Sequence, residues 1–171
     1  MEKRKNIITF AGTPMTLVGK AIKVGQIAPD FKVIATDLSE VTLKNYEGKV
    51  KVLSIVPSLD TGVCDAQTRW FNQNVTNLSS DVVVLTISMD LPFAQKRYCG
   101  ANGIENVVTL SDYRYADFGQ NYGCLIEELR LLTRTIVILD KDNTVKYVQY
   151  VPEVTTPPDY DKAVASLKSL L

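Results

Sequence analysis

The sequence has no histidine, no net charge and no long hydrophobic run. The lack of histidine removes the commonest general base and metal ligand of proteins, and since no Cys-x-x-Cys pair is present either, we expect no zinc site. Nineteen acidic and nineteen basic residues cancel, so the charge balance does not favour nucleic acid or a membrane surface. No apolar run approaches the length of a membrane span, and the basic N-terminus lacks the apolar core of a signal peptide. We therefore expect neither nucleic acid nor a membrane as a partner.

Cysteine is scarce as well, because Cys64, Cys99 and Cys124 are the only three among 171 residues. An odd number of widely spaced cysteines is not typical of the disulfide framework of a secreted protein, so we expect the protein to reside in the reducing cytoplasm. With 46% hydrophobic residues the chain can bury a sizeable core, and no repeat, linker or low-complexity stretch divides it. The prediction is a single domain over residues 1–171.

What is present is a regular succession of apolar segments separated by turn residues. In chain order, the predicted elements are two strand–turn–strand units (7–19 and 31–46), a buried strand (49–56), a helix (63–78), a buried strand (81–88), a short helix (89–100), a strand (106–110), a short helix (118–122), a hairpin (134–151) and a closing helix (160–170). The first helix is expected to bury a face made of Val63, Ala66, Trp70, Phe71, Val75 and Leu78. The second helix is expected to start with Asp90 as N-cap and to end before Gly100. This order predicts a mixed sheet with helices on both faces, as in the thioredoxin fold.

Cys64 lies at the end of the stretch VPSLDTGVC, where a buried strand stops and a helix begins. Unpaired N–H groups and the positive end of the dipole at a helix N-terminus favour a thiolate over a thiol. Thr61, three residues earlier, either caps the helix or directs its hydroxyl at the sulfur. Asp65 opposes the thiolate, so a cation from elsewhere in the chain would help.

The spacing Pro-x-x-x-Thr-x-x-Cys within VPSLDTGVC resembles the motif of the peroxiredoxins. Together with SMDLPFAQKRYCGANG and LLTRTIVILDKDNTV, it resembles the bacterial thiol peroxidases, also described as atypical 2-Cys peroxiredoxins, over nearly the whole chain. The resemblance implies a thioredoxin fold with an N-terminal β-hairpin extension and an insertion before the C-terminal β-hairpin. It also implies a thiol-dependent peroxidase for hydrogen peroxide and alkyl hydroperoxides that needs no metal or organic cofactor.

Roles for individual residues follow from the same resemblance. It implies that Cys64 is the peroxidatic cysteine and that the Thr61 hydroxyl holds both the peroxide and the thiolate. It further implies that Pro57 shields the pocket and that Arg134 is the arginine of the site. Arg134 opens a strand predicted to lie beside the one that ends at Val56, where a guanidinium could stabilise the thiolate and polarise the O–O bond.

Other arginines offer alternatives. Arg134 could be an ordinary surface charge at a strand end. Arg130, four residues earlier, competes for the same role if the predicted register is shifted. Arg69, on the Cys64 helix, is expected to be a solvated side chain.

Cys99 is implied by the resemblance to be the resolving cysteine, which forms an intramolecular disulfide with Cys64 that thioredoxin reduces. Its predicted place near a helix C-terminus disfavours its thiolate, and the alternative is a small buried hydrophobic residue. Because the two cysteines lie on different helices, we hypothesise that both segments unfold locally in each cycle.

Several expectations remain open at this level. Cys124 has no place in the family motif and is interpreted as a packed or interface thiol. A homodimer is implied by the resemblance alone. A peroxide sensor or relay that passes oxidation from Cys64 to a partner protein would use the same sulfenic acid. A disulfide oxidoreductase is weakened by the absence of Cys-x-x-Cys.

Overall fold

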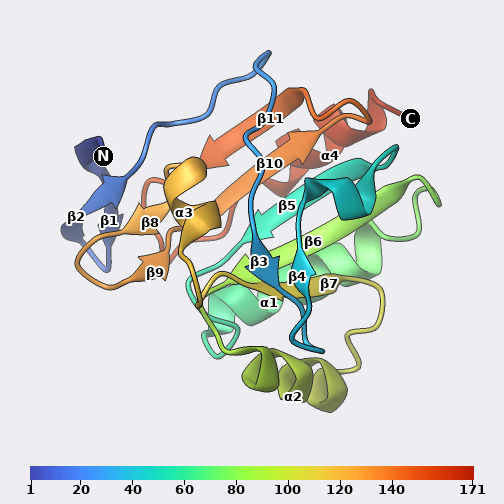
Figure 1. Ribbon diagram of the computed structural model, residues 1–171, viewed down its shortest axis with the longest axis horizontal. Coiled ribbons are helices and arrows are strands. Elements are labelled where there is room, and N and C mark those ends of the chain that lie inside the picture. Colours follow the sequence, from blue (N-terminus) through green and yellow to red (C-terminus); the bar gives the residue numbers. More distant parts are fainter.

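The computed structural model describes residues 1–171 and contains two β-sheets and four α-helices (Figure 1). The larger sheet consists of β3 (Val33–Ile34), β4 (Glu40–Val41), β5 (Val50–Ile55), β6 (Val82–Ser88), β7 (Val108–Ser111), β10 (Thr135–Leu139) and β11 (Val145–Tyr150). The smaller one consists of β1 (Lys3–Phe10), β2 (Thr13–Val18), β8 (Leu125–Ile126) and β9 (Leu131–Leu132). The helices are α1 (Gly62–Asn74), α2 (Pro92–Asn102), α3 (Asp117–Asn121) and α4 (Tyr160–Lys168), with a 3₁₀ turn at Leu43–Tyr46. None of the helices has the length and apolar character that crossing a membrane would demand.

The centre of the larger sheet follows the predicted order. Its strands are arranged β11-β10-β5-β6-β7-β3-β4, with β5, β6 and β7 parallel and β10 antiparallel to β5. All six residues of β5 are buried, as expected for a strand that is covered on both faces. Thr135 pairs with Ile55, so the start of β10 lies beside the end of β5. The segment before β10 and the segment after β5 therefore meet at the same end of these two neighbouring strands.

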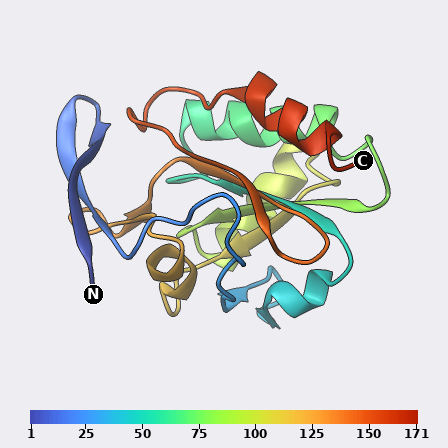
Figure 2. The same cartoon turned by 90° about the horizontal axis from the view of Figure 1, so that it is seen from above.

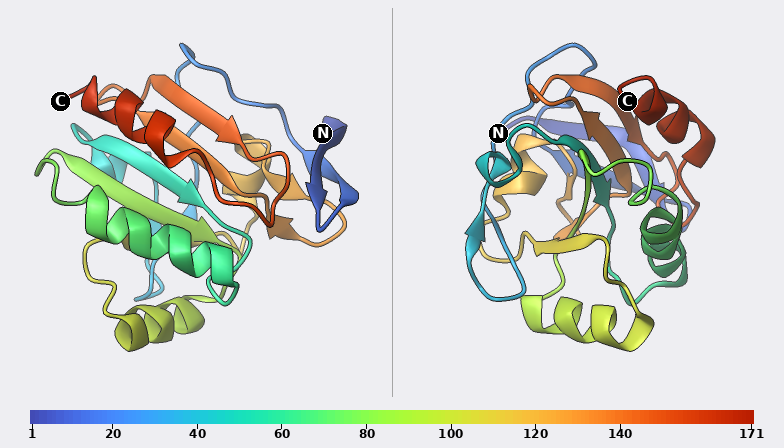
Figure 3. Two further views of the ribbon diagram at one scale, coloured as in Figure 1. Left: turned by 180° about the vertical axis from the view of Figure 1, so that it is seen from behind. Right: turned by 90° about the vertical axis from the view of Figure 1, so that its right-hand side faces the viewer.

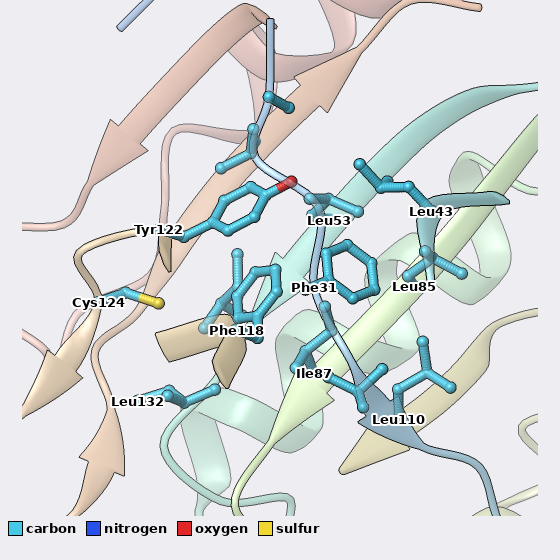
Figure 4. Close-up of a cluster of buried hydrophobic side chains, with 14 of the residues drawn as sticks. Phe31, Leu43, Leu53, Leu85, Ile87, Leu110, Phe118, Tyr122, Cys124 and Leu132 are labelled. Carbon is cyan, nitrogen blue, oxygen red and sulfur yellow. The ribbon is translucent and has the colours of Figure 1, made fainter. Parts of the chain in front are cut away.

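Helices cover both faces of this sheet, although unequally. Helices α1 and α4 run side by side along one face (Figures 2 and 3), and the cluster beneath the helices includes Phe71 of α1, Tyr98 of α2 and Leu167 of α4. On the opposite face lie the short α3 and the 3₁₀ turn, whose Leu43 belongs to the hydrophobic cluster there. The hydrophobic cluster there is drawn in Figure 4 and includes Phe31, Leu53, Leu85, Leu110, Phe118, Tyr122 and Leu132.

The N-terminal hairpin of β1 and β2 forms as predicted and stands at one end of the molecule (Figure 2). The sequence did not predict its partner, β8, which pairs with β2 through Leu17 and Ile126. β8 and β9 contain two residues each, which is too short for a hydrophobic period to be recognised. The insertion before the C-terminal hairpin thus extends the small sheet.

Two details of the predicted helix at 89–100 are wrong. Leu91 is the N-cap of α2, and the Asp90 carboxylate instead accepts hydrogen bonds from the Ser58 hydroxyl and the Leu59 N–H. The helix also continues through Gly100 and ends at Gly103, whose left-handed backbone (φ 63°) forms the C-cap. Glycine favours this conformation at a helix end, and Gly100 is not the glycine that adopts it.

The predicted buried face of α1 is partly wrong. Ala66 is exposed and Leu78 lies beyond the helix, also exposed, whereas the helix buries Cys64, Gln67, Thr68 and Phe71. A search for apolar periodicity counts apolar residues alone, so it missed a face with two polar members. Buried polar side chains require hydrogen-bond partners, and these partners define the site described next.

Candidate active site

Cys64 occupies the first turn of α1 and is completely buried. Thr61 is the N-cap residue, yet its side chain caps no backbone N–H. Its hydroxyl is within hydrogen-bond distance of both the Cys64 sulfur and the Ser58 carbonyl oxygen, the latter at 3.1 Å. Of the two roles considered for Thr61, the contact with the sulfur is therefore the one found.

Arg134 lies immediately before β10 and brings its guanidinium to the same sulfur. The side chain is only 2% exposed, and its Nη2 lies 3.3 Å from the Cys64 Sγ. Its Nη1 donates to the Gln67 Oε1 and its Nε to the Val154 carbonyl oxygen, each at 2.8 Å. None of these three acceptors is a carboxylate, so the positive charge of Arg134 remains available to stabilise a thiolate at Cys64.

Gln67 was missed by the sequence analysis and orients Arg134. It is fully buried, accepts from the guanidinium, and donates through Nε2 to the Ser54 hydroxyl of β5 at 2.7 Å. The signal that could have found it is its position three residues after Cys64, where a helix places side chains on one face. A glutamine on the buried face beside a reactive cysteine requires a polar partner there.

A cavity of about 250 Å³ opens beside the sulfur. Its lining combines polar groups at the sulfur with apolar side chains farther out: Phe10, Pro57, Thr61, Gly62, Val63, Arg134, Val154 and Thr155. Cys64 is not itself among the lining residues, but Thr61 and Arg134, which do line the cavity, both contact its sulfur. Pro57 forms part of the wall, as the resemblance implied.

Cys99 lies in α2, half-buried, with its sulfur 3.7 Å from the Thr109 hydroxyl. Burial raises the pKa of the Cys99 thiol, so it is protonated at neutral pH. Cys64 and Cys99 are both free thiols in this structure.

Contacts between α1 and α2 involve the chain neighbours of these cysteines. The Tyr98 hydroxyl donates to the Asp65 carboxylate, which also forms a 3.0 Å ion pair with Arg69. The Arg69 guanidinium donates in addition to the Asn102 side chain near the end of α2. We call these four residues the α1–α2 clasp. The Arg69 side chain is still 39% exposed, so the expectation of a solvated Arg69 is correct in part, although its guanidinium is also bonded to both helices.

Comparisons with known proteins place the chain in a family. The sequence profile of the Redoxin family matches residues 23–164. The chain is 58% identical to the thiol peroxidase of Oceanobacillus iheyensis over 94% of this chain and 97% of that protein, and 53% identical to the thiol peroxidase of Bacillus subtilis over 96% and 98%. A crystal structure of a peroxiredoxin-like protein from Aquifex aeolicus shares 44% identity with a TM-score of 0.89, covering 96% of each chain. The chain belongs to the thiol peroxidase family.

Membership in this family confirms the resemblance that the three motifs carried. It also confirms the predicted fold class and the enzyme class, an oxidoreductase of the peroxiredoxin type that reduces peroxide with thiols. The residues of the site are placed by the geometry of this chain alone. Thr61, Pro57 and Arg134 line one cavity, and Thr61 and Arg134 also contact the Cys64 sulfur.

The structure separates the remaining candidates from this site. Arg130 is exposed in the turn between β8 and β9, with a left-handed backbone (φ 55°), and makes no contact with Cys64. Cys124 is completely buried in the cluster that contains Phe118 and Tyr122 (Figure 4), where desolvation raises its pKa well above the ordinary value. Of the two interpretations of Cys124, the packed thiol is the one found.

Proposed function

We propose that this thiol peroxidase reduces hydrogen peroxide and alkyl hydroperoxides at Cys64, assisted by Thr61 and Arg134, and that Cys99 resolves the product. The observation that carries the proposal is a buried sulfur whose two polar donors, Thr61 and Arg134, also line a largely apolar cavity. Donors fixed around the reacting atoms need no reorganisation as charge moves during the reaction.

The first step is a displacement at oxygen. The Cys64 thiolate attacks one peroxide oxygen, so that an S–O bond forms while the O–O bond breaks. The leaving oxygen takes up a proton and departs as water or an alcohol, and Cys64 becomes a sulfenic acid. Negative charge moves from sulfur to the leaving oxygen, and the Arg134 guanidinium and the Thr61 hydroxyl can donate to both. Since the guanidinium and the helix N-terminus favour the thiolate as the nucleophile, this step does not call for a histidine.

The second step joins the two cysteines. The Cys99 thiol attacks the sulfenic sulfur, an S–S bond forms, and hydroxide leaves as water with the thiol proton. We propose that the α1–α2 clasp opens in this step, because it bonds Asp65 and Tyr98, the residues next to the two cysteines, to each other. An external dithiol then reduces the disulfide by a two-electron exchange, and we propose that this dithiol is thioredoxin. We also propose that the protein resides in the cytoplasm, since an odd number of cysteines suits a reducing compartment.

The proposed function is tested by mapping the cysteines after one equivalent of peroxide. Wild-type protein is expected to give a Cys64–Cys99 disulfide, whereas Cys99→Ser gives Cys64 sulfenic acid, one turnover and no recycling by thioredoxin. Intact-mass and peptide mass spectrometry measure both products. A disulfide to Cys124, or an unmodified Cys64, would overturn the assignment. Steady turnover with thioredoxin and its reductase supports the enzyme, and a single stoichiometric burst supports the sensor alternative.

We further propose that the protein is a homodimer and that the start of α2 lies in the interface. Phe93 is 68% exposed and Leu91 and Tyr113 are also exposed, and a hydrogen bond from the Ser111 hydroxyl to the Asp90 carbonyl oxygen joins the segment before α2 to the segment that leads to Tyr113. Large exposed apolar side chains that gather in one place are typical of interaction surfaces.

Phe93→Glu is expected to convert the dimer into a monomer, because it places a charge in the desolvated centre of the interface. Size-exclusion chromatography with light scattering measures the mass. Ile27→Glu serves as the matched control, since Ile27 is 66% exposed and lies outside this surface. A dimer that persists in Phe93→Glu, or a monomeric wild type, would contradict this proposal.

We also propose that residues 1–171 act as one domain. The hairpin at the start of the chain supplies Phe10 to the cavity of Cys64, and the segment after β11 supplies Val154. Segments far apart in the sequence therefore contribute to one cavity.

A further inference from the structure

Glu153 lies in the segment that leads from β11 to α4, and its carboxylate receives five hydrogen bonds. Two come from the backbone N–H groups of Ala11 and Gly12, at 2.9 and 3.0 Å, in the turn of the N-terminal hairpin. A third comes from the Thr9 hydroxyl at 2.5 Å. The other two come from the N–H and the hydroxyl of Thr155, at 3.0 and 2.7 Å. One side chain thus bonds two segments that are more than 140 residues apart.

The turn of the hairpin is shaped to receive an anion. Ala11 and Gly12 both have left-handed backbone conformations, with φ of 49° and 82°. Successive N–H groups in such turns point into a common concavity that binds negative charge. These hydrogen bonds hold the pKa of Glu153 well below its ordinary value, and the bond from Thr9 makes the largest contribution. The group in this concavity is therefore a carboxylate at neutral pH.

This contact lies directly between two walls of the Cys64 cavity. Phe10 stands between the residues that bind the carboxylate from the hairpin, and Val154 and Thr155 follow Glu153 in the chain. Figure 3 shows the hairpin lying beside the segment between β11 and α4. The position of Phe10 relative to Val154 and Thr155 therefore depends on Glu153.

The two donors at the sulfur, Arg134 and Thr61, are held by contacts that do not involve the Glu153 carboxylate. Arg134 donates to Gln67 and, through Nε, to the Val154 carbonyl oxygen, and it contacts the sulfur, while Thr61 is fixed in the loop before α1. The Val154 N–H also donates to the Thr9 carbonyl at 2.9 Å, a backbone contact that does not involve the carboxylate. Loss of the Glu153 side chain should therefore release the hairpin turn that carries Phe10, while the Val154 backbone and the donors at the sulfur keep these contacts.

We propose that Glu153 is a positioning residue that sets the selectivity of the cavity for hydroperoxides with a bulky apolar group over hydrogen peroxide. The inference rests on the proposed reaction of hydroperoxides at Cys64. Hydrogen peroxide needs only the sulfur and its two donors. A bulky apolar group must in addition be desolvated between Phe10 and Val154, and this contact requires walls at a fixed separation.

Glu153→Ala tests the proposal with two substrates, cumene hydroperoxide and hydrogen peroxide. We expect kcat/KM for cumene hydroperoxide to fall about tenfold, while that for hydrogen peroxide stays within about twofold of the wild type. Hydrogen exchange of the Ala11 and Gly12 amides should accelerate, since both lose their acceptor. Glu128→Ala is the matched control, because Glu128 accepts from the Thr16 N–H of the same hairpin at 3.0 Å but does not line the cavity.

An equal loss with both substrates would overturn the proposal, because Glu153 would then act through Arg134 or through the fold. Unchanged kinetics with both substrates would overturn it as well. If Glu153→Ala fails to fold, Glu153→Gln retains the size of the side chain while it removes the charge, and it is held to the same difference between substrates. Failure of the proposed function itself is distinguishable, since the wild type would then consume neither hydroperoxide at Cys64.

Discussion

Replacing Cys64 by serine is expected to reduce peroxide consumption to the uncatalysed background. A serine hydroxyl stays protonated at neutral pH and is a much weaker nucleophile toward a peroxide oxygen than a thiolate. The fold should persist, because serine is close in size to cysteine and its oxygen finds the Thr61 hydroxyl and the Arg134 guanidinium as partners. Peroxide consumption with thioredoxin and its reductase, together with a melting curve, measures both effects.

Cys124→Ser is the control for the loss of a thiol. Cys124 is fully buried in an apolar cluster and takes no part in the proposed reaction, so folded protein should retain its peroxidase activity. A hydroxyl without a partner in this cluster costs about 1–3 kcal/mol of stability. The two variants should therefore show opposite patterns: Cys64→Ser is stable and inactive, whereas Cys124→Ser is active and less stable. Residual turnover in Cys64→Ser would show that another thiol carries out the reaction.

Arg134→Met is expected to slow the oxidation of Cys64 by about 10²–10³-fold, the usual cost of removing one fixed donor to a developing negative charge. Methionine approximates the length of the side chain while it removes the charge and all three hydrogen bonds. The fraction of thiolate at neutral pH should fall as well, because no other cation contacts the sulfur. Stopped-flow oxidation by hydrogen peroxide measures the rate, and thiolate absorbance in the ultraviolet measures ionisation.

Two further arginine variants make this result specific. Arg134→Lys keeps a charge but lacks the planar set of donors, so it should recover only part of the lost rate. Arg130→Met removes an exposed arginine four residues away and should leave the rate unchanged. If Arg134→Met retains both its rate and its thiolate, then the cation that activates Cys64 is not Arg134.

Sequence reasoning reached the centre of the site because each part of it had a local signature. The strand that ends at Ile55 and the helix that begins at Gly62 were both visible in the hydrophobic pattern, so Cys64 and Thr61 could be placed at a helix start. The predicted pairing of β10 with β5 was also correct, and this pairing brings Arg134 to the sulfur.

The outer parts of the site lacked such signatures. Phe10 and Val154 reach the cavity from opposite ends of the chain, and their meeting depends on how the small sheet docks on the large one. Gln67 interrupts an apolar period and was therefore passed over. Aspartate is a residue type that favours the N-cap position, but the Asp90 carboxylate accepts hydrogen bonds from the Ser58 hydroxyl and the Leu59 N–H instead. This tertiary contact overrides the local preference.

The α1–α2 clasp has a consequence for survival of the enzyme at high peroxide concentrations. On the proposed mechanism, the Tyr98–Asp65 bond must break before Cys99 can reach the sulfenic acid. While it persists, a second peroxide molecule can oxidise that sulfenic acid further to a sulfinic acid, which thioredoxin does not reduce. Resolution and overoxidation therefore compete for one intermediate. On this mechanism, the strength of the clasp between α1 and α2 influences the peroxide concentration above which the enzyme inactivates itself.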